Sequence, residues 1–466
     1  MKKSIVVILF FFINFISYSQ ISFMKFYGRV YEMETFSGSS VEQTADGGYI
    51  AIGNYYNSWG ADDVFLIRTN AYGDTLWTRI INNSTNEGGY DIHQTPDGGF
   101  VYNGYILQTG FGLQACLVKV DANGYQQWIK EYGKSRDETS YSFERTFENG
   151  YILAGYSKNT ASGDSHMYLI RTDDNGDTLW TKVYESADPS YGYCVRQTID
   201  SGFVVAGKYY LGNISSKYEP ALLRTDKLGN LMFYKEMPIA GMGTINSLCQ
   251  LPDSGFALAG RIIDTVNNTY LPLLIRTDKN GDTLWTKKYG VNQGVFLSIE
   301  KTRDSCLVMA GQSNDLSVLS NLYLVKTNLN GDTMWTRSFY IDDWAPANHI
   351  QQTSDNGYII VGSVGFMMGG GEVVLLKLDG NGILQVEPHV SIEKVPAIFP
   401  NPASEYLVVN LGNNIVDEPV QVFSIAGELL LSKTVSGGSC LFDVSVLPAG
   451  VYIIKAGFVT GKFVKE

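Results

Sequence analysis

The residues QTADGGYIAIG, from Gln43 to Gly53, are the first of seven similar copies that follow one another along the chain, and this repeat indicates the fold. The position held by Gly48 in the first copy returns at spacings of 51 to 53 residues, once as Cys306. A repeat of roughly 50 residues is typical of propellers and solenoids. The other six copies begin at Gln94, Arg145, Gln197, Gln250, Lys301 and Gln352.

Each repeat predicts four antiparallel strands, here called A to D. Strand A ends at Gln43 and Thr44, and the Asp-Gly-Gly turn supplies the positive φ of a tight hairpin into strand B, 49–53. Strand C is predicted at 64–67 in the first repeat. An Asn-Gly-Asp hairpin then leads to strand D, for example at 178–184 in the third repeat. The sequence therefore predicts an all-β fold over 20–386, a seven-bladed β-propeller with four antiparallel strands per blade.

Strand D carries an aromatic residue that we expect to pack between blades rather than stack on a cofactor. The segment 24–28 near the N-terminus resembles the end of a strand D, whereas the last repeat keeps only 383–385 at that place. We therefore expect the N-terminal strand to complete the seventh blade and remove an exposed edge. The strand D aromatics are Trp77, Trp128, Trp180, Trp285 and Trp335, with Phe233 in the fourth copy.

Composition and the N-terminal residues limit the class of protein. The net charge of −12 makes nucleic acid an improbable partner, and five scattered cysteines do not form a disulfide framework. Lys2 and Lys3 precede an apolar run, 5–16, which predicts a signal peptide over 1–19 and a mature chain from Gln20. An uncleaved anchor is the alternative. No later segment is apolar enough to span a membrane, so we expect no transmembrane segment in the mature chain.

The repeats resemble the DGGYI-type propeller repeats of secreted bacterial proteins and, more distantly, quinoprotein-like blades. The resemblance covers about 21–385 and implies the propeller, but hardly any activity. A kelch propeller is the runner-up, because Gly-Gly doublets recur near Tyr and Trp. Kelch doublets close a strand, however, whereas these lie in the turn before one.

After Val386 the repeat gives way to a linker, 387–396, and a short segment of alternating strands, 397–466. This segment resembles the C-terminal sorting domain of type IX secretion substrates of Bacteroidota, a small immunoglobulin-like β-sandwich. The resemblance implies the type IX secretion machinery as a partner, and a secreted protein that is extracellular or on the outer-membrane surface. The motif residues are Pro400, Asn401, Pro402, Gly427, Leu447, Pro448, Gly450 and Tyr452.

Two sets of loops differ between the predicted faces of the propeller. The A–B and C–D turns are nearly the same in every repeat, whereas the D–A and B–C loops vary and suit a binding site on a rigid scaffold. Aromatic residues there stack on sugars or grip a protein, unless they merely cap the blades. We expect a non-enzymatic module for an unidentified glycan or protein, with these ligand-binding candidates: Tyr55, Tyr56, Trp59, Tyr209, Tyr210, Asp342, Asp343 and Trp344.

A second set of candidates lies on strand A, six or eight residues before the marker glycine. If strand A is innermost, these side chains reach the central channel, where carboxylates or histidines would suit a secreted glycan hydrolase or lyase. A solvated channel wall is the more common outcome, and we predict no metal and no cofactor, because the Asp-x-Asn-Gly-Asp turns lack the other ligands of a calcium loop. The channel candidates are Glu42, Asp91, His93, Glu144, Arg196, Glu300 and His349.

Overall fold

The computed structural model divides the chain into two compact units, Met1–Gln385 and Val386–Glu466. The predicted signal peptide, 1–19, and the predicted linker, 387–396, lie outside the described residues. The structure describes residues 20–28, 35–56, 62–82, 86–110, 112–133, 137–158, 163–212, 217–239, 242–264, 269–290, 293–315, 318–341, 345–365, 371–384, 397–399, 402–410, 419–434, 439–456 and 459–466.

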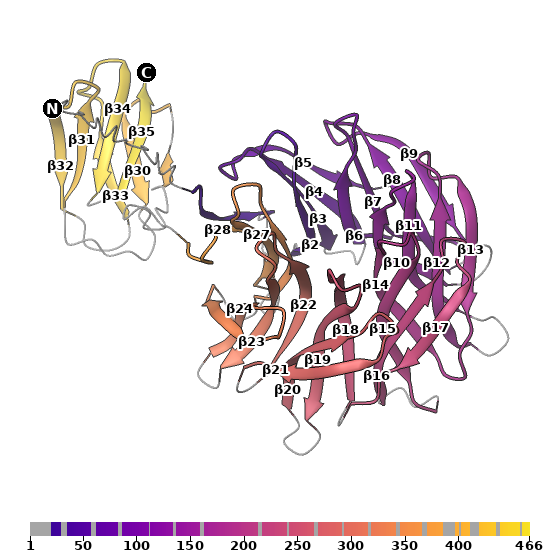
Figure 1. The fold of residues 1–466 in the computed structure, drawn as a ribbon. Helices are drawn as coiled ribbons and strands as arrows, with labels where there is room; N and C mark the ends of the chain where they lie inside the picture. The colour runs from indigo at the N-terminus through magenta and orange to yellow at the C-terminus, as the bar shows by residue number, and fades with distance from the viewer. Residues whose placement is uncertain are drawn as a thin grey trace, which may run out of the picture. The chain divides into compact units, whose positions relative to one another are not determined.

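The first unit consists of seven four-stranded antiparallel sheets, which follow one another around a centre as the blades of a propeller (Figure 1). Every regular element among the described residues is a strand, so the predicted all-β class is confirmed. Strand A of blades 1 to 7 is β2 (Thr35–Gln43), β6 (Glu87–Gln94), β10 (Glu138–Arg145), β14 (Ser190–Gln197), β18 (Met242–Gln250), β22 (Gln293–Lys301) and β26 (Ala347–Gln352).

In blades 1 to 6 the other strands pair outward in sequence order, and in blade 7 the outermost strand is β1. Strand B is β3 (Tyr49–Tyr56), β7 (Phe100–Gln108), β11 (Tyr151–Lys158), β15 (Phe203–Tyr210), β19 (Phe256–Asp264), β23 (Leu307–Asp315) and β27 (Tyr358–Val364). Strand C is β4 (Asp62–Thr69), β8 (Gly112–Val120), β12 (Ser165–Thr172), β16 (Tyr218–Thr225), β20 (Thr269–Thr277), β24 (Val318–Thr327) and β28 (Glu372–Leu378). Strand D is β5 (Thr75–Ile81), β9 (Gln126–Tyr132), β13 (Thr178–Tyr184), β17 (Leu231–Glu236), β21 (Thr283–Lys288), β25 (Thr333–Phe339) and β1 (Phe23–Tyr27).

The acidic residue of each A–B turn pairs with a buried cation of strand C, a role that the sequence did not reveal. Arg68 Nη2 lies 2.6 Å from Asp46 Oδ2, and Lys377 Nζ lies 2.9 Å from Asp355 Oδ2. The cation lies against the marker glycine, since a Cβ added to Gly48 would lie 2.5 Å from Arg68 Nη1. A buried cation is tolerated because it is paired and hydrogen-bonded. The other pairs are Lys119–Asp97, Arg171–Glu148, Arg224–Asp200, Arg276–Asp253 and Lys326–Asp304.

The aromatic residue of strand D packs on the next blade, as predicted. A Cβ on Gly124 of blade 2 would lie 2.8 Å from the ring of Trp77 in blade 1, whose Nε1 donates to Ala122 O at 3.1 Å. A tyrosine at the end of the strand adds a bond, since Tyr132 Oη donates to Gly176 O at 2.7 Å. Neighbouring blades are therefore joined at their outer strands by ring packing and a hydrogen bond.

The N-terminal strand closes the ring, which confirms the predicted pairing. β1 runs antiparallel to β28, with Phe23 opposite Lys377 and Tyr27 opposite Val373. Phe23 takes the place of the strand D tryptophan against Gly73 of blade 1, and Tyr27 Oη donates to Gly73 O at 2.6 Å. The seventh blade is thus made from both ends of the first unit.

The second unit has two antiparallel sheets that share one core, which includes Leu407, Val422 and Phe463. One sheet has the order β29 (Ala397–Phe399), β30 (Tyr406–Asn410) and β33 (Ser439–Asp443). The other has the order β32 (Leu429–Lys433), β31 (Val420–Ser424), β34 (Gly450–Ala456) and β35 (Val459–Lys465).

The described motif residues of this unit lie mostly in its turns or in its core. Gly427 has a φ of 85° in the turn after β31, and Gly450 begins β34. Leu447 and Tyr452 are buried, and Tyr452 Oη donates to Pro448 O at 2.6 Å. Pro402 is exposed, whereas Pro400 and Asn401 lie outside the described residues.

Candidate functional site

Strand A of every blade carries a β-bulge at the same place, and this bulge determines what lines the channel. In blade 2 the register shifts between Gly89 and Asp91, so Tyr90 is the extra residue. A bulge re-aims side chains, and here the bulged residue and the residue after it both line the channel cavity. The bulge residues of blades 1 to 7 are Ser39, Tyr90, Tyr141, Tyr193, Asn246, Leu297 and Asn348.

The channel carboxylates mostly link neighbouring blades. Glu42 Oε2 accepts a hydrogen bond from the backbone nitrogen of Gln94 in the next blade at 2.9 Å. Glu144 and Glu300 accept from the next blades in the same way, from Gln197 and Gln352. Innermost strands of a propeller have no sheet partner on the channel side, so these side chains satisfy their backbone donors.

The residue that follows the bulge forms a second row of such links. Ser247 and Ser298 accept from the backbone nitrogens of Ile299 and Ile350 at 3.2 and 3.3 Å. His349 takes the serine's place in blade 7, and its Nδ1 lies 3.3 Å from Val41 N and 3.1 Å from Val41 O. Burial lowers the pKa of His349.

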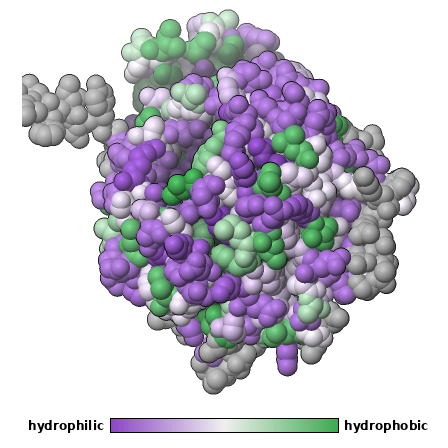
Figure 2. All heavy atoms as spheres, turned by 45° about the vertical axis from the view of Figure 1, so that its right-hand side comes forward, coloured by the Kyte–Doolittle hydropathy of each residue, from purple (hydrophilic) through white to green (hydrophobic). Residues whose placement is uncertain are grey.

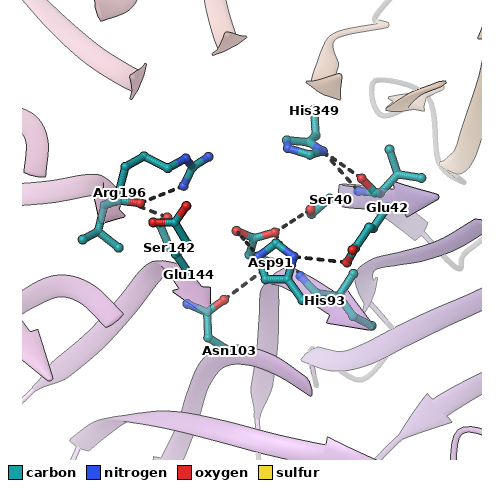
Figure 3. A network of polar contacts seen from close by, with 12 residues as sticks. Ser40, Glu42, Asp91, His93, Asn103, Ser142, Glu144, Arg196 and His349 are labelled. Carbon is teal, nitrogen blue, oxygen red and sulfur yellow. Dashed lines mark hydrogen bonds and ion pairs between the residues drawn. The ribbon is translucent and has the colours of Figure 1, made fainter. Parts of the chain in front are cut away.

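A charged cluster departs from this pattern in blades 1 and 2 (Figure 3). His93 Nδ1 lies 3.1 Å from Glu42 Oε2, and its Nε2 lies 3.9 Å from Asp91 Oδ2. Asp91 also accepts from Ser40 Oγ at 2.6 Å. Burial by itself would lower the pKa of His93, but the negative charges of Asp91 and Glu42 outweigh it and raise this pKa to about 9.

The next two blades carry Glu144 and Arg196 beside this cluster (Figure 3). Arg196 Nη1 donates to Val195 O at 2.7 Å, and the arginine opposes the rise that burial imposes on the pKa of Glu144. Burial also raises the pKa of Glu300, to about 7. All seven channel candidates thus lie on strand A, but most of their side chains already form hydrogen bonds with backbone groups.

The raised pKa of His93 predicts that the first unit loses stability in alkali. A group whose pKa is higher in the folded state stabilises that state fully when the pH is below the group's unfolded pKa, here 6.5. This contribution to the free energy of unfolding disappears as the pH rises through the folded pKa of about 9. We expect urea-unfolding midpoints to decline over this range and the decline to vanish in His93→Gln. An equal decline in parent and variant would contradict the assignment.

A belt of eight tyrosines from blades 2, 3 and 4 lines one side of a mouth of the channel, and the sequence analysis named only one of them, Tyr210. Ring centroids of Tyr141 lie 5.2 Å from Tyr90 and 5.3 Å from Tyr193, and the contacts continue into strand B, as between Tyr90 and Tyr105 at 6.0 Å. Every member is half-buried, so part of each ring faces solvent. The tyrosine belt consists of Tyr90, Tyr105, Tyr141, Tyr156, Tyr191, Tyr193, Tyr210 and Tyr218.

The belt lies toward the face of the D–A and B–C loops, since its members follow the start of strand A, end strand B or begin strand C. The three bulge tyrosines line a cavity of about 100 Å³, together with Asp91 and Arg196. Elsewhere, exposed large apolar side chains are scattered among polar ones, as the face in Figure 2 shows. The belt is therefore the aromatic site to which a ligand entering the channel mouth would come.

The predicted ligand-binding tyrosines have different surroundings. Tyr210 belongs to the belt, where its ring lies 5.8 Å from Tyr191. Tyr209 is buried and donates to Glu219, and Tyr55 packs on Phe36 at 4.8 Å. Tyr56 is half-buried at the end of β3. The remaining candidates lie outside the described residues: Trp59, Asp342, Asp343 and Trp344.

Neither a metal-binding cluster nor a membrane-spanning helix occurs among the described residues. Within those residues, no three His, Cys, Asp or Glu side chains come together as a metal site would require. The same residues contain no helix with the length and apolar character needed to cross a bilayer. All five cysteines are free thiols.

Residues 397–466 match the family model of the secretion system C-terminal sorting domain. The second unit is therefore a type IX sorting domain, and the protein is exported to the cell surface or the extracellular space. No curated protein matches the chain in sequence.

Several solved structures are similar in fold at very low sequence identity. Quinohemoprotein alcohol dehydrogenase from Comamonas testosteroni is 10% identical, with a TM-score of 0.46 over 78% of this chain and 77% of its own. PorZ, a surface component of the type-IX secretion system of Porphyromonas gingivalis, is 11% identical, with a TM-score of 0.41 over 91% of this chain and 58% of its own. The Pan2 WD40 domain of Neurospora crassa is 10% identical, with a TM-score of 0.45 over 73% and 88%.

Proposed function

We propose that this exported propeller is a binding module that takes a saccharide at the tyrosine belt. The observation that carries the proposal is the belt itself, eight half-buried tyrosines in contact along one side of a channel mouth, over blades 2 to 4. Tyrosine rings offer flat apolar faces for the C–H face of a sugar, and their hydroxyls offer hydrogen bonds at the rim. A concave aromatic site with a few polar groups is the usual form of a small-ligand site.

Binding is favoured over catalysis by the surroundings of the channel carboxylates. A glycan hydrolase needs two carboxyl groups free to act on the scissile bond. Glu42, Glu144 and Glu300 instead accept backbone hydrogen bonds from neighbouring blades. His93, with its pKa raised to about 9, carries a proton at neutral pH and is a poor general base there.

We also propose the finer points of export. The signal peptide over 1–19 would deliver the chain across the inner membrane of a Gram-negative member of the Bacteroidota. The sorting domain over 397–466, as an immunoglobulin-like β-sandwich, would then engage the type IX secretion machinery. Lys2, Lys3 and the apolar run 5–16 support the signal peptide, and the order of the sorting motifs supports the sorting domain.

The glycan proposal predicts that belt tyrosines are needed for affinity. Loss of an aromatic anchor at the centre of a site costs about 2 kcal/mol or more in binding free energy. We expect Tyr141→Ala and Tyr210→Ala to weaken binding by roughly 30-fold or more for the oligosaccharide that a glycan array selects. Titration calorimetry measures the affinity, and thermal unfolding shows that each variant is folded.

Tyr72→Ala provides the matched control. This tyrosine is 62% exposed in a C–D turn on the opposite face, so its loss should leave affinity unchanged. Tyr141→Phe separates the ring from the hydroxyl and should retain most of the binding. If the array detects no saccharide, or if a protein partner binds and no glycan does, the proposal is wrong.

A further inference from the structure

We propose that the saccharide is acidic, and that its carboxylate or sulfate group binds between Lys208 and Arg261 at the tyrosine belt. This inference rests on the proposed function and specifies its ligand class. Lys208 is on β15 in blade 4, and Arg261 is on β19 in blade 5. Both are half-buried, so both keep contact with solvent at the channel mouth.

The ammonium group of Lys208 is surrounded by rings. Its Nζ lies 5.0 Å from the ring centroid of Tyr210. The ring centroids of three other tyrosines of the belt lie 5.2 to 5.5 Å from the same atom. Aromatic faces attract a cation but do not neutralise its charge. Burial lowers the pKa of Lys208, the sign of a cation that has lost water without gaining a counter-charge.

Arg261 continues the same surface into the next blade. Its Nη2 donates to Tyr218 Oη at 3.2 Å, and its guanidinium carbon lies 4.9 Å from the ring centroid of Tyr270. Tyr218 also contacts Lys208, so one tyrosine connects the two cations. A guanidinium group presents several donors in a plane, which suits a carboxylate or sulfate.

These two cations lack the acidic partner that most of the comparable cations of the propeller have; the exceptions on strand D, such as Lys182, bond an amide or backbone oxygen instead. The seven strand C cations pair with turn acids, and lysines of strand D such as Lys130 and Lys235 pair with Asp177 and Asp282. Within the part of the chain that the structure describes, no carboxylate lies within 4.0 Å of Lys208 or Arg261. An external anion is the missing counter-charge.

The repeat shows that the fold does not require these cations. Lys208 and Arg261 each stand six residues after the marker glycine, at the same place in consecutive repeats. They are also positive charges on a chain of net charge −12, whose general surface repels anions. The other five repeats have different residues at that place: Asn54, Tyr105, Tyr156, Gln312 and Ser363.

The test compares matched acidic and neutral sugars on the full exported protein. The probes are oligouronates and sulfated oligosaccharides, each beside its carboxyl-reduced or desulfated counterpart. We expect at least one acidic probe to bind roughly tenfold or more tightly than its counterpart, with an affinity that falls as salt rises. A comparison of the oligouronates with the sulfated oligosaccharides shows whether the bound group is a carboxylate or a sulfate.

Variants then assign the preference to the two side chains. Lys208→Met and Arg261→Met keep most of the apolar stem, and each should reduce the preference roughly tenfold. Lys208→Arg should retain it, and Lys227→Met removes one charge from an exposed turn on the other face without effect. Thermal unfolding shows that the variants are folded.

The possible results separate this inference from the proposed function. Neutral and acidic sugars that bind equally would overturn the acidic ligand and leave a glycan-binding module. An acidic preference that survives both methionine variants would overturn the role of Lys208 and Arg261. No binding to any sugar would overturn both proposals.

Discussion

Phe23→Ala together with Tyr27→Ala is expected to open the propeller ring. Phe23 is buried against Gly73 and Tyr49, with its ring centroid 5.8 Å from that of Tyr49, and Tyr27 donates to Gly73 O. Truncation of a buried aromatic costs roughly 3–5 kcal/mol, so the pair removes a large part of a usual domain stability. The urea-unfolding midpoint of the first unit should fall more than in any other variant described above.

Opening has a second consequence, which separates it from simple loss of packing. β1 is the outermost strand of blade 7 and pairs with β28, so a weakened β1 exposes the edge of β28. Exposed edges promote pairing between molecules. We therefore expect faster proteolysis before Thr35 and a tendency to aggregate. Phe26 lies on the same strand and is 41% exposed, so Phe26→Ala should change the unfolding midpoint little. A double variant with the parent's midpoint would contradict ring closure by β1.

A chain that ends at residue 396 should disappear from the medium and from the cell surface. The sorting domain is a separate compact unit with its own core, so its removal leaves the blades and their closure intact. The propeller should therefore accumulate inside the cell envelope in folded form, and secretion should fall to background. Immunoblots of periplasm and medium, with and without 397–466, measure the change.

The converse experiment sharpens this prediction. Fusion of 397–466 to an unrelated periplasmic reporter should carry that reporter outside, whereas the same fusion with Tyr452→Ala should export less, because Tyr452 is a buried core residue that stacks on Phe463. Secretion of the truncated chain at the parent's level would contradict the role of the sorting domain.

The repeat made the fold predictable because its turns carry strong local chemistry. Gly47 and Gly98 adopt the positive φ that the Asp-Gly-Gly turn requires, and the aromatic residues of strand D pack between blades as expected. The N-terminal strand was predictable because it resembles the end of a strand D. These signals lie within a few residues of one another, so a single chain displays them.

The side chains that line the channel mouth were not predictable, because the bulge interrupts the regular alternation of side chains between the two faces of a strand. Regular strands turn successive residues to opposite faces, but here Tyr90 and Asp91 both line the cavity. The sequence did hold a trace of the belt, since Tyr90, Tyr141 and Tyr193 recur at the repeat spacing. The structural role of Glu42 had no such trace, because its partner is a backbone nitrogen in the next repeat.

The closing blade also sets the order in which the molecule can be completed. Blades 1 to 6 are each one continuous stretch, but Gln20 receives a hydrogen bond from Gly380, 360 positions away. A chain that emerges with its N-terminus first therefore carries β1 without a partner until the last repeat has emerged. Contacts between such distant residues form slowly. Closure of the ring is thus a late step of folding, and until it happens β1 and the outer edge of β28 both lack a strand partner.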